Sequence, residues 1–256
     1  MSAGTLVQAD SGGALGTLDP RCRLLGAVAG VVVIAGLHRP AAIASALGLG
    51  LLLALLARLP ARPLLRRLAH LEGFLLLLLV LLPLTMPGPA LVSLGPLALS
   101  ELGLARALGL IGRITAATLM LAALLGPLEP TRIGAAAARL KLPPALVTLF
   151  LLTVRYAALF GDEARRLGEA MRVRGFVPRA SVHGWRSLGA FLGMLLVRAL
   201  DRAERVTEAM RCRGWAGRMP VSDHPPFTWA DGVFAALLTA ALLALVVLER
   251  LPEMLP

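Results

Sequence analysis

The chain has 256 residues, of which 57% are hydrophobic and only 16% are charged, and its mean hydropathy is +0.78. It still carries a net charge of +11, because 26 basic residues, all but one of them arginine, oppose 15 acidic ones. This balance excludes a disordered chain, a collagen-like chain and an ordinary soluble domain, in which about 25% of residues are charged. The composition predicts a polytopic membrane protein whose arginines report its orientation.

Five apolar stretches are predicted to span the membrane. Residues 1–20 read as a polar tail without the basic region of a cleavable signal. A span needs about 20 apolar residues, with a range of roughly 17–25. The predicted spans are 24–37, which is short for a full crossing, 41–57, 71–86, 104–125 and 227–248. Two further apolar stretches, 144–160 and 188–200, are not predicted to cross.

The placement of arginine predicts which side each loop occupies. The loop at 58–70 carries four arginines and no acid, whereas residues 88–103 carry only Glu101. By the positive-inside rule the first loop is cytoplasmic and the second is outside. Residues 161–218 hold twelve arginines and six acids, so a crossing by 144–160 would place a strongly basic region outside. The prediction is therefore a cytoplasmic N-terminus and an outside C-terminus.

The predicted fold class is all-α: about five transmembrane helices with a cytoplasmic helical domain inserted before the last span. The predicted divisions are a polar tail at 1–20, transmembrane helices 1–4 at 21–125, the cytoplasmic domain at 126–225, and the last transmembrane helix with a C-terminal tail at 226–256. Residues 135–140 are expected to form a further short helix along the membrane interface.

The spans themselves offer little chemistry. The acids lie at span ends, so no chain of buried acids suggests a proton relay. Arg106 and Arg113 stand seven residues apart on one face of the fourth span, and a functional role and plain structural pairing both stay open for Arg113. Small residues at four-residue spacing permit close helix packing, but the Ala- and Gly-rich composition explains them equally well. These pairs are Gly26/Gly30, Ala44/Gly48, Ala46/Gly50 and Gly112/Ala116.

An internal repeat lies in the basic region. Residues 162–176 read DEARRLGEAMRVRGF and residues 201–215 read DRAERVTEAMRCRGW, at an offset of 39. Nine of the fifteen positions are identical, and the last position is aromatic in both copies. The identities are Asp162/Asp201, Ala164/Ala203, Arg166/Arg205, Glu169/Glu208, Ala170/Ala209, Met171/Met210, Arg172/Arg211, Arg174/Arg213 and Gly175/Gly214. The chain therefore makes the same local structure twice.

Each copy predicts a helix that ends in an arginine and a glycine. Glycine takes the left-handed conformation that closes a helix, and the aromatic residue after it can fold back on the last turn. An apolar stripe at 4-3-4-3 spacing leads to each arginine. The stripes are Phe160, Ala164, Leu167, Met171 and Arg174, and Ala199, Ala203, Val206, Met210 and Arg213. Such an arginine complements the helix dipole and offers five donors to a carboxylate or carbonyl group.

Three simpler explanations of the repeat stay open. The arginines would only enforce topology, the stripes would only lie on anionic lipid at the bilayer surface, or the two stripes would only pack on each other. None of these requires a duplicated ending. A partner with two equivalent sites, such as a dimer, does require one.

These residues resemble the transmembrane T component of energy-coupling-factor (ECF) ABC importers, the EcfT/CbiQ family, and most of all its cobalt/nickel subgroup, CbiQ. The resemblance covers nearly the whole chain after the N-terminal tail. It includes the residues Leu18-Asp19-Pro20-Arg21, the loop at 58–70, the run at 139–155 and both endings. The family's signature is Ala-Arg-Gly at the tips of two cytoplasmic coupling helices. Here the endings are Val173-Arg174-Gly175 and Cys212-Arg213-Gly214, with the alanine replaced in both.

The resemblance implies a non-catalytic subunit of an importer in a bacterial inner membrane. A CbiO-like ABC ATPase dimer, the A component, would receive the two tips and hydrolyse ATP. A CbiM-like substrate-binding membrane subunit, the S component, would carry cobalt or nickel, with a small CbiN-like subunit as an optional further partner, in support of cobalamin biosynthesis. The implied ATPase-coupling residues are Met171, Arg172, Arg174, Gly175, Met210, Arg211, Arg213 and Gly214.

No catalytic residue, cofactor site or metal site is predicted in the chain. It has no GxxxxGK[ST] phosphate loop, and its four histidines are scattered. A membrane enzyme is disfavoured because no paired acids or nucleophile motifs stand near the spans. The alternative to a transport subunit is a membrane-anchored scaffold that binds anionic lipid or nucleic acid through its basic insert, in a salt-dependent way. The residues do not distinguish cobalt from nickel or a vitamin.

Overall fold

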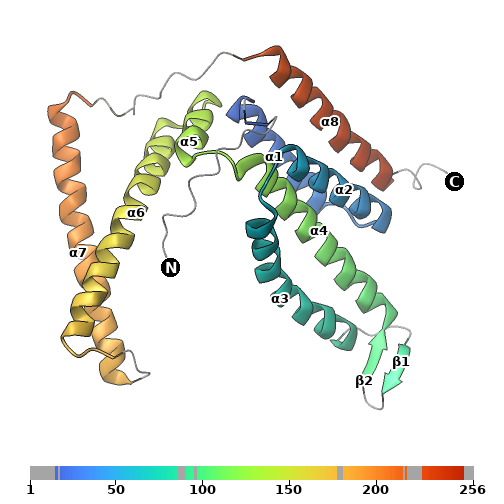
Figure 1. Cartoon of the computed structure of the whole chain (residues 1–256), viewed down its shortest axis with the longest axis horizontal. Coiled ribbons are helices and arrows are strands. Elements are labelled where there is room, and N and C mark those ends of the chain that lie inside the picture. Colours follow the sequence, from blue (N-terminus) through green and yellow to red (C-terminus); the bar gives the residue numbers. More distant parts are fainter. Residues whose placement is uncertain are drawn as a thin grey trace. The chain divides into compact units, whose positions relative to one another are not determined.

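A computed structural model of the chain describes residues 15–16, 18–85, 90–94, 97–177, 181–215, 217 and 227–250 (Figure 1). The described residues form two compact units. One comes from residues 9–128 and 224–256 and is called the bundle below. The other comes from residues 129–223 and is called the basic segment.

The described residues are almost entirely helical, so the predicted all-α polytopic fold is confirmed. The bundle contains α1 (Pro20–Ala35), α2 (Pro40–Leu56), α3 (Ala61–Thr85), α4 (Glu101–Leu125) and α8 (Trp229–Arg250). The basic segment contains α5 (Pro130–Arg139), α6 (Pro144–Val173) and α7 (Val182–Cys212). The expected short helix at 135–140 corresponds to the second half of α5.

A short hairpin between α3 and α4 was not predicted. Strand β1 (Ala90–Leu94) pairs antiparallel with β2 (Leu97–Ser100), within the stretch expected to be a loop. The strands are only five and four residues long. Apolar runs of this length do not reveal a strand by their period alone.

The stretch at 58–70 was predicted as a loop, and that prediction was wrong for most of its length. α3 begins at Ala61, ten residues before the predicted third span, so Arg62 and Arg66 lie on its first turns. Pro63 does not prevent this, because the first turn of a helix has no use for the amide hydrogen that proline lacks. The break between α2 and α3 lies instead at Arg58, whose φ of 47° is left-handed.

Three described helices, α4, α6 and α8, are long and apolar enough to cross a membrane, while α2 and Leu75–Thr85 of α3 are apolar but shorter. The 16 residues of α1 extend about 24 Å at 1.5 Å per residue, less than the roughly 30 Å of a bilayer's hydrocarbon core. In α6 the apolar stretch at 144–160 continues without a break into the first copy of the repeat. That this stretch does not cross stays a prediction.

Small residues set the spacing of the bundle helices. A Cβ atom on Gly112 of α4 would lie 2.5 Å from Cγ2 of Ile43, and one on Gly50 of α2 would lie 3.1 Å from Cβ of Leu119. Three of the four small-residue pairs pack in this way, namely Gly26/Gly30, Ala46/Gly50 and Gly112/Ala116. Ala44 and Gly48 are exposed. Close packing therefore explains most of the spacing, and composition explains the remaining pair.

The same contacts fix the directions of α1 to α4. Ile43 and Gly50 of α2 meet successive turns of α4, so these two helices run parallel. α1 runs antiparallel to α4, because Gly30 lies against Met120 while the earlier Arg23 bonds to Leu124. α3 is also antiparallel to α4, since its Pro83 lies against Gly103 at the start of α4.

Helix α8 packs parallel to α1 in a constant register. Asp231 bonds to the amide of Asp19, Leu238 packs on Gly26, and Glu249 bonds to the amides of His38 and Arg39. Consequently α1, α3 and α8 begin, and α2 and α4 end, at one end of the bundle. This end is called the junction end, because the chain leaves the bundle there after α4 and returns there at α8.

Candidate functional site

The two copies of the repeat form the C-terminal halves of the long helices α6 and α7. α6 starts with a proline in its first turn, and α7 is capped by Ser181, whose side chain accepts a hydrogen bond from the amide of Gly184 at 3.1 Å. The helices run in opposite directions and cross (Figure 1), and an ion pair joins Glu163 of α6 to Arg198 of α7. The two copies therefore end at opposite ends of a crossed pair.

The first tip, residues 171–176, closes α6 with a Schellman motif. Gly175 has a φ of 82°, in the left-handed region. Its amide donates to the carbonyl of Arg172 at 2.9 Å, and the amide of Phe176 donates to the carbonyl of Met171 at 3.0 Å. These two bonds satisfy carbonyls that a helix end otherwise leaves without partners. Arg174 is the last residue before the reversal.

The second tip, residues 210–215, repeats this structure. Gly214 has a φ of 75°, and its amide donates to the carbonyl of Arg211 at 3.0 Å. The amide of Trp215 donates to the carbonyl of Met210 at 3.0 Å. Arg213 occupies the position that Arg174 has in the first tip. The predicted glycine conformation and the predicted reversal at the aromatic residue are thus confirmed in both copies.

Side-chain exposure also repeats. The exposure class of the paired residues agrees along the whole repeat except at Ala164, which is half-buried, and Ala203, which is exposed. The other stripe residues that precede the arginines are half-buried. Among the predicted coupling residues, the two methionines are half-buried and the rest are exposed: Arg172, Arg174, Gly175, Arg211, Arg213 and Gly214.

The guanidinium groups at the tips have no ionic partner among the described residues of the basic segment, whereas two other arginines of α6 and α7 do. Arg165 pairs with Asp162 at 2.8 Å, and Arg198 pairs with Glu163. Within the described parts of the basic segment, neither Arg174 nor Arg213 makes an ion pair or a side-chain hydrogen bond. Each tip therefore presents a guanidinium on a backbone fixed by the cap, a geometry suited to a carboxylate or carbonyl on another protein.

The tips lie far apart. Arg174 and Phe176 line a hollow of about 260 Å³ together with His183 and Ser187, so the first tip adjoins the start of α7. The second tip lies at the other end of that helix. The 30 residues from His183 to Arg213 extend about 45 Å at 1.5 Å per residue. One small ligand cannot bind both tips, but a large partner with two sites can.

The remaining sequence candidates have local roles. Nε of Arg113 donates to the carbonyl of Gly109 in its own helix at 3.3 Å, which supplies the structural partner that the sequence left open. No group of three or more His, Cys, Asp or Glu side chains that could hold a metal occurs in the part of the chain that the structure describes.

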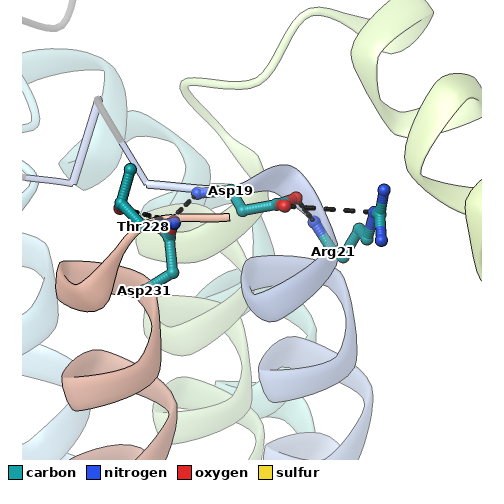
Figure 2. Close-up of polar contacts among 4 residues, drawn as sticks. All are labelled: Asp19, Arg21, Thr228 and Asp231. Atoms are coloured by element: carbon teal, nitrogen blue, oxygen red, sulfur yellow. Dashed lines mark hydrogen bonds and ion pairs between the residues drawn. The ribbon is translucent and has the colours of Figure 1, made fainter. Parts of the chain in front are cut away.

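Sequence reasoning missed Asp231, a buried carboxylate near the start of α8. It accepts hydrogen bonds from the amide and hydroxyl of Thr228 and from the amide of Asp19 (Figure 2). The signal was available, because Thr228-Trp229-Ala230-Asp231 before an apolar run has the spacing of a capping box. Its second partner, more than 200 residues away, has no such signal.

Comparison with known proteins finds matches to cobalt transport proteins. A family model described as CbiQ, cobalt transport protein, matches residues 14–223, which include both tips and end before α8. The chain is also similar to the cobalt transport protein CbiQ of Rhodobacter capsulatus, with 32% identity over 139 residues. That match covers 53% of this chain and 56% of the relative, so the chain matches about half of the relative's length.

Proposed function

The chain belongs to the CbiQ family of cobalt transport proteins, and from that premise we propose that it is the energy-coupling transmembrane subunit of an ECF-type importer. In this role it hydrolyses no ATP. It transmits the movement of a separate ATPase pair, the CbiO-like A component, to a separate substrate-binding membrane subunit.

The observation that carries this proposal is the duplicated tip. Two identical caps hold Arg174 and Arg213 on opposite ends of a crossed helix pair. An ATPase dimer has two equivalent surfaces related by two-fold symmetry, so it can receive one tip in each subunit. The half-buried stripes would add apolar contact, and acidic groups on each ATPase would pair with the arginines. ATP-driven closing of the dimer would then move α6 relative to α7.

The bundle supports the proposed orientation. The chain leaves and re-enters the bundle at the junction end, so the basic segment returns to the side it left and crosses the membrane an even number of times. α6 is apolar enough to cross, but α7 does not share that property. We therefore propose that neither crosses, and that the surplus of arginine places the basic segment and the N-terminus in the cytoplasm of a bacterial inner membrane.

For the cargo we propose Co²⁺ or Ni²⁺, bound by a CbiM-like S component with an optional CbiN-like subunit. The family description and the relative's name, both of which refer to cobalt transport, support this choice. In this proposal the S component binds the ion, and this chain needs no ion-binding site.

A charge reversal tests the proposal. The double variant Arg174→Glu/Arg213→Glu should lower the affinity for the ATPase pair at least about a hundredfold, because removing one member of a buried charge pair costs about 2–5 kcal/mol. The measurement is co-purification and titration of the complex in detergent. The matched control is Arg166→Glu/Arg205→Glu, which makes the same charge change at another exposed, repeated pair of arginines, eight residues earlier.

The control separates the proposal from the scaffold alternative. A binder of anionic lipid or nucleic acid responds to total charge and salt, so both double variants would weaken it equally. Equal loss in the two double variants would therefore overturn the coupling function. Loss confined to the tip variant, with membrane insertion intact, would support it.

A further inference from the structure

The bundle is joined to the basic segment at two places, and both are hydrogen-bonded to the first turn of α1. The chain leaves the bundle after α4, which ends at Leu125, and returns at α8, which begins at Trp229. The first turn of α1 contains Asp19, which caps it, and Arg23. These two residues bond to the end of α4 and to the start of α8.

The first joint depends on Arg23. This side chain is only 1% exposed, and its Nε donates to the carbonyl of Leu124 at 2.9 Å while Nη1 donates to the carbonyl of Leu15 at 3.0 Å. The carbonyls in the last turn of a helix have no partner within the helix and carry the negative end of its dipole. The guanidinium therefore ties the last turn of α4 to the first turn of α1.

The second joint depends on Asp231, which is 2% exposed. Oδ2 accepts from the amide and hydroxyl of Thr228 at 2.8 and 2.7 Å, and Oδ1 accepts from the amide of Asp19 at 2.6 Å (Figure 2). One carboxylate thus caps the N-termini of two parallel helices, where negative charge is favoured.

We propose that the first turn of α1 is the anchor through which movement of the basic segment enters the bundle, with Arg23 and Asp231 as its positioning residues. The inference rests on the proposed coupling function. Because both joints are fixed to one helical turn, the last turn of α4 and the first turn of α8 move together with the start of α1. Without the anchor, each joint bends separately and ATP hydrolysis continues without productive transport.

The opposite end of the same helix pair provides a matched control. Glu249, near the end of α8, accepts hydrogen bonds from the amides of His38 and Arg39 at 3.0 and 3.2 Å. Like Asp231, it is a carboxylate of α8 that accepts from backbone amides, here those that precede α2 directly after α1. It lies away from both joints, so it stabilises the pair of helices without taking part in coupling.

The test uses the whole complex with its ATPase and substrate-binding subunits in proteoliposomes, with Co²⁺ as the transported probe. Asp231→Asn keeps the size of the side chain but replaces an acceptor oxygen with a donor. We expect Co²⁺ transported per ATP hydrolysed to fall about tenfold, the size of one lost charge-assisted hydrogen bond. Glu249→Gln should keep this ratio within about twofold of the wild type, because an effect on stability alone does not change the ratio.

A milder variant keeps the test possible if the Asp231→Asn protein does not insert into the membrane. Thr228→Val removes only the hydroxyl bond to Oδ2 and should lower the ratio about threefold. A readout without cargo is hydrogen exchange of the backbone amides at Asp19 and at residues 21–23. It should change between nucleotide-free and ATP-bound complexes of the wild type and of Glu249→Gln, but not of Asp231→Asn.

Two results would overturn the inference: equal ratios in Asp231→Asn and Glu249→Gln, or an unchanged ratio in Thr228→Val when Asp231→Asn is not recovered. If the wild type transports no Co²⁺, an absence of nucleotide-dependent exchange at residues 19 and 21–23 overturns it. Failure of the proposed function is a different result. If the chain does not couple to an ATPase through its tips, the tip variant Arg174→Glu/Arg213→Glu would keep the ATPase bound.

Discussion

Glycines that pack between helices of the bundle differ in their surroundings from glycines of α6, α7 and their tips. In the bundle, a Cβ atom on Gly50, Gly103 or Gly112 would lie within 3.1 Å of another helix. Six glycines of α6, α7 and their tips have open space instead, with no atom within 4 Å of the added carbon: Gly161, Gly168, Gly175, Gly189, Gly193 and Gly214. The bundle needs glycine for close packing, while the tips need it for backbone conformation.

This difference shows how one chain combines a closely packed helical bundle with a surface for a partner. Helices in a membrane gain little from hydrophobic burial against each other, so close approach at small residues and polar links position them. α6 and α7, like the bundle helices, expose large apolar side chains, such as Leu149, Leu192 and Leu196. What the repeat fixes in α6 and α7 is the backbone conformation at their C-terminal tips. Added methyl groups should therefore act on different properties, on stability where bundle helices pack closely and on affinity for the partner at the tips.

The largest effect is expected from Gly103→Ala in the bundle. The new methyl group would lie 2.6 Å from Cα of Pro83 and 2.8 Å from the carbonyl oxygen of Leu82, and backbone atoms cannot move aside as a flexible side chain can. We expect α3 and α4 to separate at a cost of about 1–3 kcal/mol, measured as a lower midpoint of thermal unfolding in detergent. Binding of the ATPase pair to the folded fraction should not change.

The control for this substitution is Gly48→Ala in α2, where nothing lies within 4 Å of the added carbon. Alanine is the better helix former by about 1 kcal/mol, so the midpoint should stay the same or rise. Equal destabilisation by the two variants would show that close packing does not govern the bundle.

A smaller effect is expected from Gly175→Ala at the first tip. The site has room for a methyl group, but its φ of 82° costs an L-residue about 1–2 kcal/mol. We expect the cap to loosen and the affinity for the ATPase pair to fall at least about fivefold, with little change in thermal unfolding of the bundle. Titration of the complex measures this, and Gly214→Ala should match it because the second cap is the same.

Gly168→Ala, two turns earlier in α6, is the matched control for Gly175→Ala. It adds the same methyl group, also into open space, but in a helix interior where alanine is favoured by about 1 kcal/mol. Affinity should be unchanged or slightly higher. Should Gly168→Ala weaken binding as much as Gly175→Ala, the tip would have no special part in recognition.

Much of this comparison could be predicted from the sequence, because it rests on local rules. The repeat, the left-handed glycines and the arginines at the helix ends follow from residues within a few positions of one another. The helices of the bundle follow from apolar runs. The start of α3 was misplaced because the arginines at 62 and 66 looked like a loop, although arginine is a good helix former.

The parts that could not be predicted depend on residues distant in sequence. Asp231 caps its own helix by a local rule, but its bond to the amide of Asp19 exists only because α8 packs parallel to α1. In the same way, no local pattern shows that Arg23 is buried against the carbonyl of Leu124, more than 100 residues away. Backbone acceptors leave no trace in the sequence.

The smallest effect is expected where the two long helices cross. Arg198 and Glu163 form an ion pair whose side chains are 48% and 27% exposed, so water and salt screen it. Arg198→Gln should change the stability of the protein by less than about 1 kcal/mol, and the double variant with Glu163→Gln should show a coupling energy of similar size. Thermal unfolding of the four proteins at low and high salt measures both values.

Affinity for the ATPase pair should also stay near that of the wild type, because the tips keep their caps. A large loss of affinity in Arg198→Gln alone would mean that recognition depends on the crossing of α6 and α7 as well as on the tips, and that the spacing between the two arginines is set at this ion pair.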